Sequence, residues 1–279
     1  DLHSFPTRRS SDLEPAAKQA VRFNRRLVNA LIHADAQDGG VRPGQLHVAI
    51  IGAGATGTEL AAELHRTARE VIAHGLDRID PRRDLRIILI EAADRILPAL
   101  PERISEAALE ILQGIGIEVR TGARVSEVTA DGVKLAGGDF IPSELVVWAA
   151  GIKAPKFLSN LDGLETNRIN QLVVTPTLQT TRDPKIFAMG DCAACPREGF
   201  DSPVPPRAQA AHQEASHLAK QLRRLIDGKQ LAPYRYRDFG SLVSFGDYSA
   251  VGNLMGFLVG RNLDRKSTRL NSSHRTGSR

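Results

Sequence analysis

Cysteine and long hydrophobic runs are both scarce in this sequence of 279 residues. Its two cysteines cannot form the disulfide framework typical of small secreted domains, and no secretory hydrophobic segment is present, so a reducing, cytoplasmic setting is expected. The longest apolar run, at 251–260, contains glycines and is far shorter than the roughly 20 residues that span a bilayer. No transmembrane helix is therefore expected.

An excess of basic charge is also missing once the two ends are set aside. Residues 1–13 and 264–279 resemble direct translations of sequencing-adapter DNA, so we expect both segments to be artefacts and residues 14–263 to be the biological part. The ends hold seven of the 37 Lys and Arg residues and three of the 32 Asp and Glu residues, which leaves 30 against 29. A nearly neutral chain lacks the basic face that nucleic-acid binding requires, so no nucleic-acid partner is expected.

A glycine-rich loop is the first feature that points to a ligand. In VAIIGAGATGTEL, residues 48–60, apolar β-formers lead into a loop and then into a helix-forming segment. Gly52 permits a tight turn, Gly54 lets the backbone approach a pyrophosphate, and Gly57 lets helix and strand pack closely. The motif predicts a dinucleotide site, although a glycine-rich turn without a ligand would also read this way. The loop alone does not distinguish a nicotinamide dinucleotide from a flavin one.

Alternating strand and helix patterns favour an α/β fold with a parallel sheet and one to two domains. Strands are predicted at 46–51, 85–91 and 145–149, and helices at 14–37, 58–74, 102–113 and 206–227. The apolar face expected for the first helix comprises Val21, Leu27, Val28, Leu31 and Ile32.

Shorter extended runs are predicted elsewhere in the chain. The segments from IEVRTG at 117–122 to the strand at 145–149 predict an antiparallel meander, with turns at Asp131-Gly132 and Gly137-Gly138. The run KIFAMGD, at 185–191, predicts a buried strand, and 234–263 predicts strands and turns.

Glu91 lies at the end of the second predicted strand, where an acidic side chain can bond the adenosine ribose hydroxyls and repel a 2′-phosphate. This position favours NAD over NADP. A solvated acid at a strand end is the alternative interpretation, and the nearby Arg95 leaves some tolerance of NADP open.

Six segments carry a resemblance to a known family: GAGATGTELAAEL, EAADRILPALPERIS, VWAAGIKAP, GLETNRINQLVVTPTLQTTRDPKIFAMGDCAACP, VPPRAQAAHQ and GSLVSFGDYSAVGNLMG. Together they resemble type II NADH dehydrogenases, single-subunit NADH:quinone oxidoreductases that pump no protons, over essentially all of 14–263. The resemblance implies two cofactors, FAD and NADH, and hydride transfer from NADH to flavin followed by electron transfer to a membrane quinone in the respiratory chain. It also implies a bacterial-type peripheral protein on the cytoplasmic face of the plasma membrane, held there by a C-terminal region missing here, and it allows a homodimer.

The family's two-dinucleotide-domain flavoprotein fold implies which cofactor the glycine loop holds. An NADH domain is inserted into an FAD domain, and the AMGD motif at 188–191 resembles the second flavin signature, so the loop at 52–57 is the NADH one. The resemblance implies a complete NAD Rossmann domain with a β-meander, plus the C-terminal half of the FAD domain. The resulting division is 1–13 and 264–279 as adapter-derived ends, 14–40 as a connecting helix from the truncated FAD domain, 41–153 as the NADH domain, 154–233 as the C-terminal part of the FAD domain, and 234–263 as the start of the C-terminal domain. The first flavin fingerprint is missing, so this fragment is expected to hold FAD poorly and to be inactive alone.

The resemblance also implies roles for individual residues. Glu59 is implicated in proton supply to quinone, although the helix dipole alone would favour a carboxylate near this helix start. Gln209 and Gln213 share a helix face at i, i+4 and are placed beside the isoalloxazine at the quinone pocket, with plain surface polarity as the alternative. Gly190 permits close approach of the flavin, and Asp191 accepts bonds from its ribitol chain. Gly151 fits a close-approach glycine at the edge of the dinucleotide domain.

Two further constellations carry no predicted chemistry. Cys192 and Cys195 form C-x-x-C, but they follow the flavin aspartate directly, which favours a structural pair over a thiol relay. His212 and His217 share a helix face poorly and lack partners, so no metal is expected. The rival functions are a disulfide, ferredoxin or rubredoxin reductase, and a noncatalytic NAD-binding module.

Overall fold

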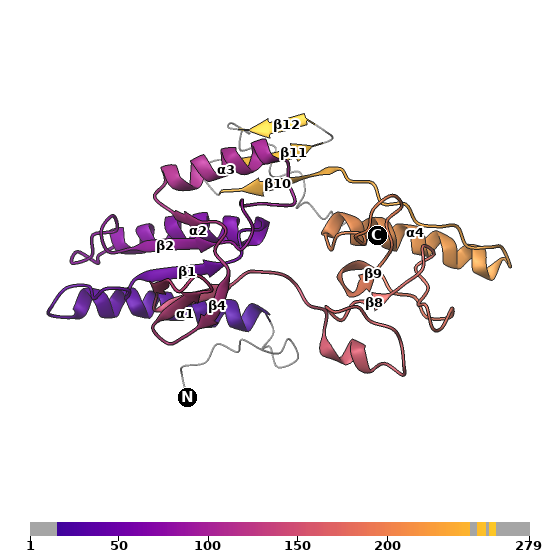
Figure 1. Cartoon of the computed structure of the whole chain (residues 1–279), viewed down its shortest axis with the longest axis horizontal. Coiled ribbons are helices and arrows are strands. Elements are labelled where there is room, and N and C mark those ends of the chain that lie inside the picture. Colours follow the sequence, from indigo (N-terminus) through magenta and orange to yellow (C-terminus); the bar gives the residue numbers. More distant parts are fainter. Residues whose placement is uncertain (1–15, 246–249, 255–256, 261–279) are drawn as a thin grey trace, which may run out of the picture. The chain divides into compact units, whose positions relative to one another are not determined.

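The computed structural model describes residues 16–245, 250–254 and 257–260 (Figure 1). The ends expected to be adapter-derived lie outside these residues. The described chain forms two compact units, of which the first contains the chain up to Gly151 and again from Gly240, and the second contains Ile152–Phe239. Each unit is described by itself.

A parallel sheet forms the centre of the first unit. Its strands are β1 (His47–Ile51), β2 (Arg86–Ile90), β3 (Glu118–Arg120) and β7 (Leu145–Trp148), in the order β3-β2-β1-β7. The whole of β1 except His47 is buried, as expected for a central strand that is covered on both faces. The α/β fold with a parallel sheet is therefore confirmed.

Three helices accompany this sheet: α1 (Ala16–Ala36), α2 (Ala55–Ala73) and α3 (Glu102–Gly114). The predicted apolar face of α1 was partly wrong, because Val21 is 60% exposed and Ile32 is 50% exposed. The buried row instead combines Leu27 and Leu31 with the small residues Ala30 and Ala34. These positions recur every three to four residues, and alanine completes a packed stripe that a search for large apolar residues overlooks.

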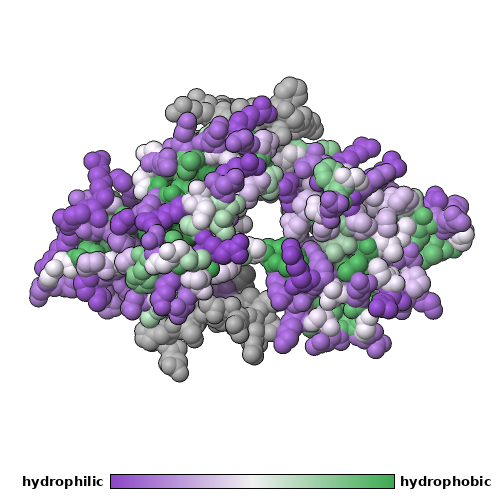
Figure 2. All heavy atoms as spheres, viewed as in Figure 1, coloured by the Kyte–Doolittle hydropathy of each residue, from purple (hydrophilic) through white to green (hydrophobic). Residues whose placement is uncertain are grey.

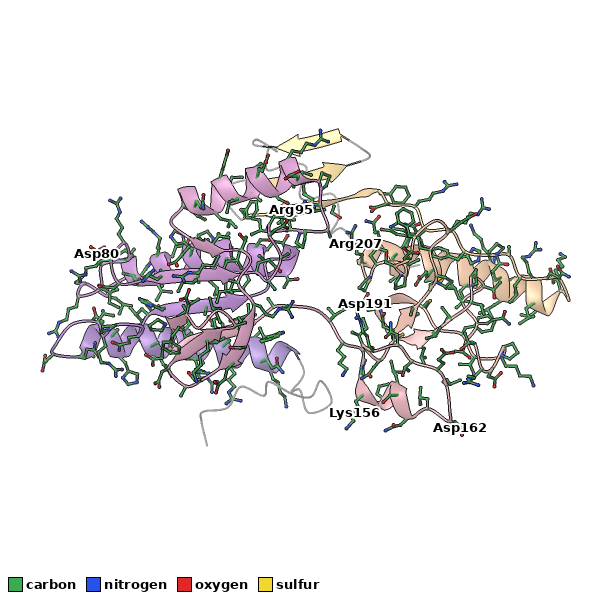
Figure 3. All side chains as sticks on the ribbon, in the orientation of Figure 1. Asp80, Arg95, Lys156, Asp162, Asp191 and Arg207 are labelled. Carbon is green, nitrogen blue, oxygen red and sulfur yellow. The ribbon has the colours of Figure 1, made fainter. Side chains whose placement is uncertain are left out.

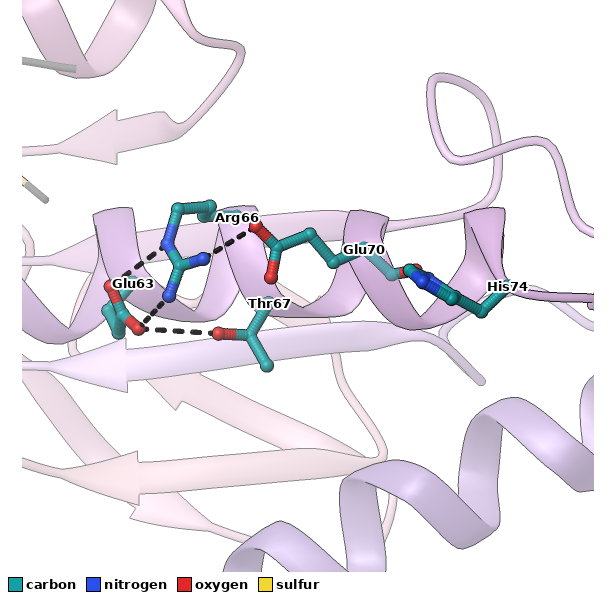
Figure 4. Close-up of polar contacts among 5 residues, drawn as sticks. All are labelled: Glu63, Arg66, Thr67, Glu70 and His74. Carbon is teal, nitrogen blue, oxygen red and sulfur yellow. Dashed lines mark hydrogen bonds and ion pairs between the residues drawn. The ribbon is translucent and has the colours of Figure 1, made fainter. Parts of the chain in front are cut away.

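Charged side chains stabilise the solvent-facing side of α2 (Figure 4). Arg66 bridges Glu63 and Glu70, with nitrogen to oxygen distances of 2.5 Å to each, and Thr67 donates a hydrogen bond to Glu63. Spacings of three and four residues place these groups on one side of the helix. The opposite side of α2 is consequently left to the small, apolar residues that pack on the sheet, among them Ala61, Ala62 and Ala68.

The meander comprises β4 (Val125–Val128), β5 (Gly132–Leu135) and β6 (Phe140–Pro142), which pair antiparallel as predicted. Gly132 has a φ of +153°, and a Cβ there would lie 2.1 Å from the Ile141 carbonyl oxygen, so this turn requires glycine. The prediction for IEVRTG was wrong, because this run forms β3 and pairs parallel with β2. It follows α3 directly, and a strand after a helical crossover joins the parallel sheet.

The second unit contains a two-stranded parallel ladder of β8 (Leu172–Val173) and β9 (Ala193–Ala194), the short 3-10 helices η1 (Lys156–Asn160) and η2 (Gly190–Cys192), and the long helix α4 (Ala208–Ile226). The predicted buried strand at 185–191 was wrong. Ile186 and Met189 are about 40% exposed, and only an isolated bridge joins Phe187 to Gln179. The ladder residue that pairs with Leu172 is Ala193, so the strand follows the AMGD motif rather than containing it.

The last described strands are β10 (Gly240–Ser244), β11 (Ala250–Leu254) and β12 (Phe257–Gly260), which form an antiparallel sheet in the first unit. Val243 and Phe245 are fully buried in the same hydrophobic core as α1 and β1. The end of β10 and Phe245 are thus packed into the core of this unit. Figure 2 shows hydrophilic residues over most of the visible face of each unit, with smaller apolar areas among these hydrophilic residues.

Candidate functional site

The glycine loop between β1 and α2 has the geometry that its sequence predicts. Gly52 has a φ of +105°, and a Cβ there would lie 2.6 Å from the Cα of Ala150 on the neighbouring chain segment. A Cβ on Gly57 would lie 1.8 Å from the Gly52 carbonyl oxygen, so both positions exclude any other residue. Gly54 differs, because no described atom lies within 4 Å of a Cβ built there. This open space leaves room for a ligand to lie against the backbone of Gly54.

Ala53, between the first two glycines, is held from two directions. Its N–H donates to the Glu91 carboxylate at 2.7 Å, and its carbonyl accepts the Leu97 N–H at 2.7 Å. The second carboxylate oxygen of Glu91 accepts the Ala93 N–H at 3.0 Å. Glu91 therefore fastens the glycine loop to the end of β2. Each carboxylate oxygen offers two lone-pair sites, so this role leaves acceptor capacity for ribose hydroxyls.

The N-terminus of α2 presents backbone N–H groups that have no partner within the helix. The first bond of the helix type is made by the Thr58 N–H to the Gly54 carbonyl, at 3.0 Å. The N–H groups of Ala55, Thr56 and Gly57 thus precede the hydrogen-bond ladder, and Gly54 caps none of them with a side chain. No acidic residue lies in the first turn to compete for the helix dipole. These donors fit the oxygens of a pyrophosphate.

Glu59 lies in the second turn of α2, because the helix begins at Ala55 and not at Thr58 as predicted. The helix dipole consequently acts on it more weakly than at a first-turn position. One oxygen of its carboxylate accepts the Ser244 N–H of β10 at 3.1 Å. The structure therefore ties this glutamate to the C-terminal sheet of the same unit, a partner that the sequence did not reveal.

Two other predicted residues lie at the edges of this site. The Arg95 guanidinium donates to the carbonyls of Pro98 and Leu100, at 3.2 and 3.4 Å, so it is engaged within its own loop. Gly151, the last residue of the first unit before the chain enters the second, has a φ of +72° with no described atom within 4 Å of its missing Cβ. Glycine is favoured there by backbone conformation.

In the second unit, Gly190 and Asp191 open the short helix η2 beside the β8–β9 ladder (Figure 3). Gly190 has a φ of +71° and packs on Ala211 of α4, whose Cβ would lie 3.3 Å from a Cβ at this position. The Asp191 side chain is exposed. An exposed carboxylate on a close-approach glycine turn is an acceptor suited to a hydroxyl-rich ligand.

Gln209 and Gln213 share one face of α4, as their spacing predicts. The Gln213 amide makes two bonds to the backbone of Arg237, donating to its carbonyl at 2.9 Å and accepting its N–H at 3.1 Å. Gln209 accepts the Phe239 N–H at 3.1 Å and donates to the Asp238 carboxylate at 3.4 Å. Together the two amides dock the extended segment 237–239 along α4.

The two cysteines form no disulfide, and Cys195 is buried. Both are free, and burial, with a smaller contribution from the charge of Glu214, raises the pKa of Cys195 to about 12.

His217, one of the two histidines on α4, pairs with the Ala232 carbonyl at 2.9 Å. Across the described residues, no group of three or more His, Cys, Asp or Glu side chains has the geometry of a metal site.

Residues 12–215 match the model of the pyridine nucleotide-disulphide oxidoreductase family. The chain belongs to this family. It is 41% identical over 251 residues to a type II NADH:quinone oxidoreductase of Haemophilus influenzae, covering 86% of this chain and 56% of that protein. It is 30% identical over 246 residues to the type II NADH:quinone oxidoreductase Ndh of Mycobacterium tuberculosis, covering 84% and 52%. The chain thus spans about half the length of these relatives.

Solved structures of related enzymes and reductases are similar to this chain in fold. NDH2 from Plasmodium falciparum in complex with NADH superposes with a TM-score of 0.74 at 19% identity, covering 88% of this chain and 65% of that one. A ferredoxin reductase from Rhodopseudomonas palustris superposes with a TM-score of 0.56 at 27% identity, covering 75% and 47%. The family match and these superpositions agree with the fold class predicted from the sequence.

Proposed function

We propose that the whole protein to which this chain contributes is an FAD-dependent enzyme that oxidises NADH and reduces a quinone. The observation that carries the proposal is the 41% identity to a type II NADH:quinone oxidoreductase over 86% of the chain. That stretch contains both the glycine loop of the first unit and the Gly190-Asp191 turn of the second. In the net reaction NADH and a proton reduce the quinone to its quinol, leaving NAD⁺.

NADH is assigned to the glycine loop of the first unit. Its pyrophosphate would lie against Gly54 and accept bonds from the free N–H groups that begin α2, where the helix dipole favours negative charge. Glu91 would accept bonds from the adenosine ribose hydroxyls while it continues to hold Ala53. Because the negative charge of this carboxylate would repel a 2′-phosphate, the arrangement favours NADH over NADPH. Gly151 would let the chain pass close to the bound dinucleotide.

FAD is assigned to the second unit. When bound, it supplies the chemistry that accepts a hydride from NADH and passes two electrons to the quinone. Gly190 would allow the close approach of the cofactor, and the exposed Asp191 carboxylate would accept bonds from its ribitol hydroxyls. Gln209 and Gln213 would define one wall of the quinone pocket through the segment that they dock. Glu59 would hold a transferable proton at its carboxylate.

We further assign the whole protein to the cytoplasmic face of the plasma membrane, as a peripheral protein that can form a homodimer. Within the part of the chain that the structure describes, no helix has the length and apolar character needed to cross a bilayer. A membrane-soluble quinone requires that its reductase reach the lipid surface, which is the physical argument for peripheral attachment.

The proposal is tested by comparing electron acceptors for the purified whole protein. NADH oxidation should proceed with a short-chain quinone and fail with a disulfide or an oxidised ferredoxin. Preference for either of the latter acceptors would favour a reductase of the disulfide or ferredoxin type. NADH binding without oxidation in the presence of FAD and any of these acceptors would leave only a dinucleotide-binding module.

A further inference from the structure

The turn that presents Asp191 is fastened by two buried polar side chains that none of the assignments above uses. Glu214 comes from α4 and is 2% exposed, and Gln171 immediately precedes β8 and is also 2% exposed. Both direct their polar atoms to the backbone of Gly190 and Asp191. Buried groups of this kind are costly to desolvate, so their partners identify what they stabilise.

Glu214 holds the turn from the side of α4. Its carboxylate accepts the Gly190 N–H at 2.6 Å, and Ala211, one helical turn earlier, is the residue against which Gly190 packs. Burial raises the pKa of Glu214, the Gly190 N–H lowers it, and the negative charge of Asp191 raises it again. Burying a carboxyl group here, beside Cys195 and Tyr234, carries a large desolvation penalty, which a single bond to a backbone N–H does not offset.

Gln171 holds the turn from the side of β8. Its side-chain nitrogen donates to the Asp191 carbonyl at 3.0 Å. The orientation of this amide is fixed, because its oxygen accepts a bond from the Asn167 side chain at 2.9 Å. The Asn167 carboxamide oxygen in turn accepts the N–H groups of Ile169 and Gln171, each at 3.0 Å.

We infer that Glu214 and Gln171 are positioning residues for the Asp191 carboxylate. One fixes the N–H that precedes Asp191 and the other fixes its carbonyl, so the backbone is held on both sides while the side chain projects outward. The inference rests on the proposed function, in which Asp191 binds the ribitol hydroxyls of FAD. It adds that flavin affinity depends on two side chains that do not touch the flavin.

The inference is tested by titrating the apo form of the whole protein with FAD and following flavin fluorescence. Asp191→Ala, Glu214→Ala and Gln171→Ala should each weaken FAD binding by about tenfold or more, the effect expected when a charge-assisted bond or its alignment is lost. Glu214→Gln keeps an oxygen that can accept the Gly190 N–H, so it should restore affinity to within a few-fold of the wild type. The double variant Glu214→Ala/Asp191→Ala should bind no more weakly than Asp191→Ala alone, because Glu214 acts through Asp191.

Gln221→Ala is the matched control. Gln221 is also a buried polar residue of α4, 5% exposed, and its side-chain oxygen accepts the Ala232 N–H at 2.8 Å, away from the turn. Its loss should lower the melting temperature without changing FAD affinity. If Glu214→Ala does not fold, Gln171→Ala still tests whether FAD affinity depends on a side chain that holds the Asp191 backbone.

The outcomes separate the inference from the proposed function. Unchanged affinity in Glu214→Ala and Gln171→Ala, with a loss in Asp191→Ala, would overturn the positioning roles and leave the flavin assignment standing. Unchanged affinity in Asp191→Ala would overturn the flavin assignment itself. Additive losses in the double variant would show that Glu214 affects binding by a route other than Asp191.

Discussion

Replacing Gly54 by alanine tests whether this glycine is needed for NADH binding rather than for folding. None of the described atoms lies within 4 Å of the added Cβ, and the backbone φ of −71° is one that alanine adopts freely. Gly54 is the N-cap of α2, where alanine is less favourable than glycine by roughly 1 kcal/mol. We expect the melting temperature to fall by only a few degrees. NADH binding should be lost, because the new methyl group occupies the space through which a pyrophosphate reaches the helix N–H groups.

Gly57→Ala provides the contrast. Its Cβ would lie 1.8 Å from the Gly52 carbonyl oxygen, so the loop and α2 must separate by about 1.5 Å to restore ordinary contact. Such overpacking costs about 3 kcal/mol or more and should lower the melting temperature by about 6–12 °C, together with the loss of NADH binding. Gly114→Ala, at the last residue of α3 with open surroundings, should leave NADH binding unchanged and should not lower the melting temperature.

The assay is NADH titration by fluorescence together with thermal unfolding of each variant. A Gly54→Ala variant that binds NADH with wild-type affinity would refute the assignment of the phosphate to this loop. Equal destabilisation by Gly54→Ala and Gly57→Ala would refute the distinction between an open and a closed glycine.

Three smaller predictions concern surface charge, thiol chemistry and pH. Arg66→Ala should lower the unfolding free energy only slightly, and any loss should shrink further in high salt, because its two ion pairs are solvent-exposed. Iodoacetamide should label Cys192, which is half-buried, well before Cys195, whose pKa is raised to about 12 by burial; equal rates would contradict this. Burial, and secondarily Arg69, lowers the pKa of His65 below its usual 6.5, so the unfolded chain binds this proton more readily. Stability should therefore be lost as pH falls below about 6.5, and His65→Asn should flatten that part of the denaturation profile.

Local features of the site could be predicted from the sequence, and long-range ones could not. The glycine loop was predictable because its steric requirements arise from adjacent residues and one strand neighbour. The bond between Glu91 and Ala53 joins residues 38 positions apart, and that between Glu59 and Ser244 joins residues 185 apart, so neither leaves a local pattern. Glu214 was missed for the same reason, since a single acid within a helix reads as a solvated side chain.

The errors in secondary structure have a related physical cause. KIFAMGD is apolar enough for a strand, but pairing requires a neighbour, and the ladder partner of Leu172 is Ala193 instead. In IEVRTG the strand itself was predicted correctly, whereas its partner was not, because the choice between parallel and antiparallel pairing is made by the helix that precedes it.

The most direct test of the account is to mix the flavin-loaded whole protein with NADH under anaerobic conditions and then to add quinone. The account predicts that NADH bleaches the flavin absorbance and that quinone restores it, with Gly54→Ala abolishing the bleaching at NADH concentrations that saturate the wild type. A flavin that stays oxidised in the presence of NADH, or one that quinone fails to reoxidise, would contradict it.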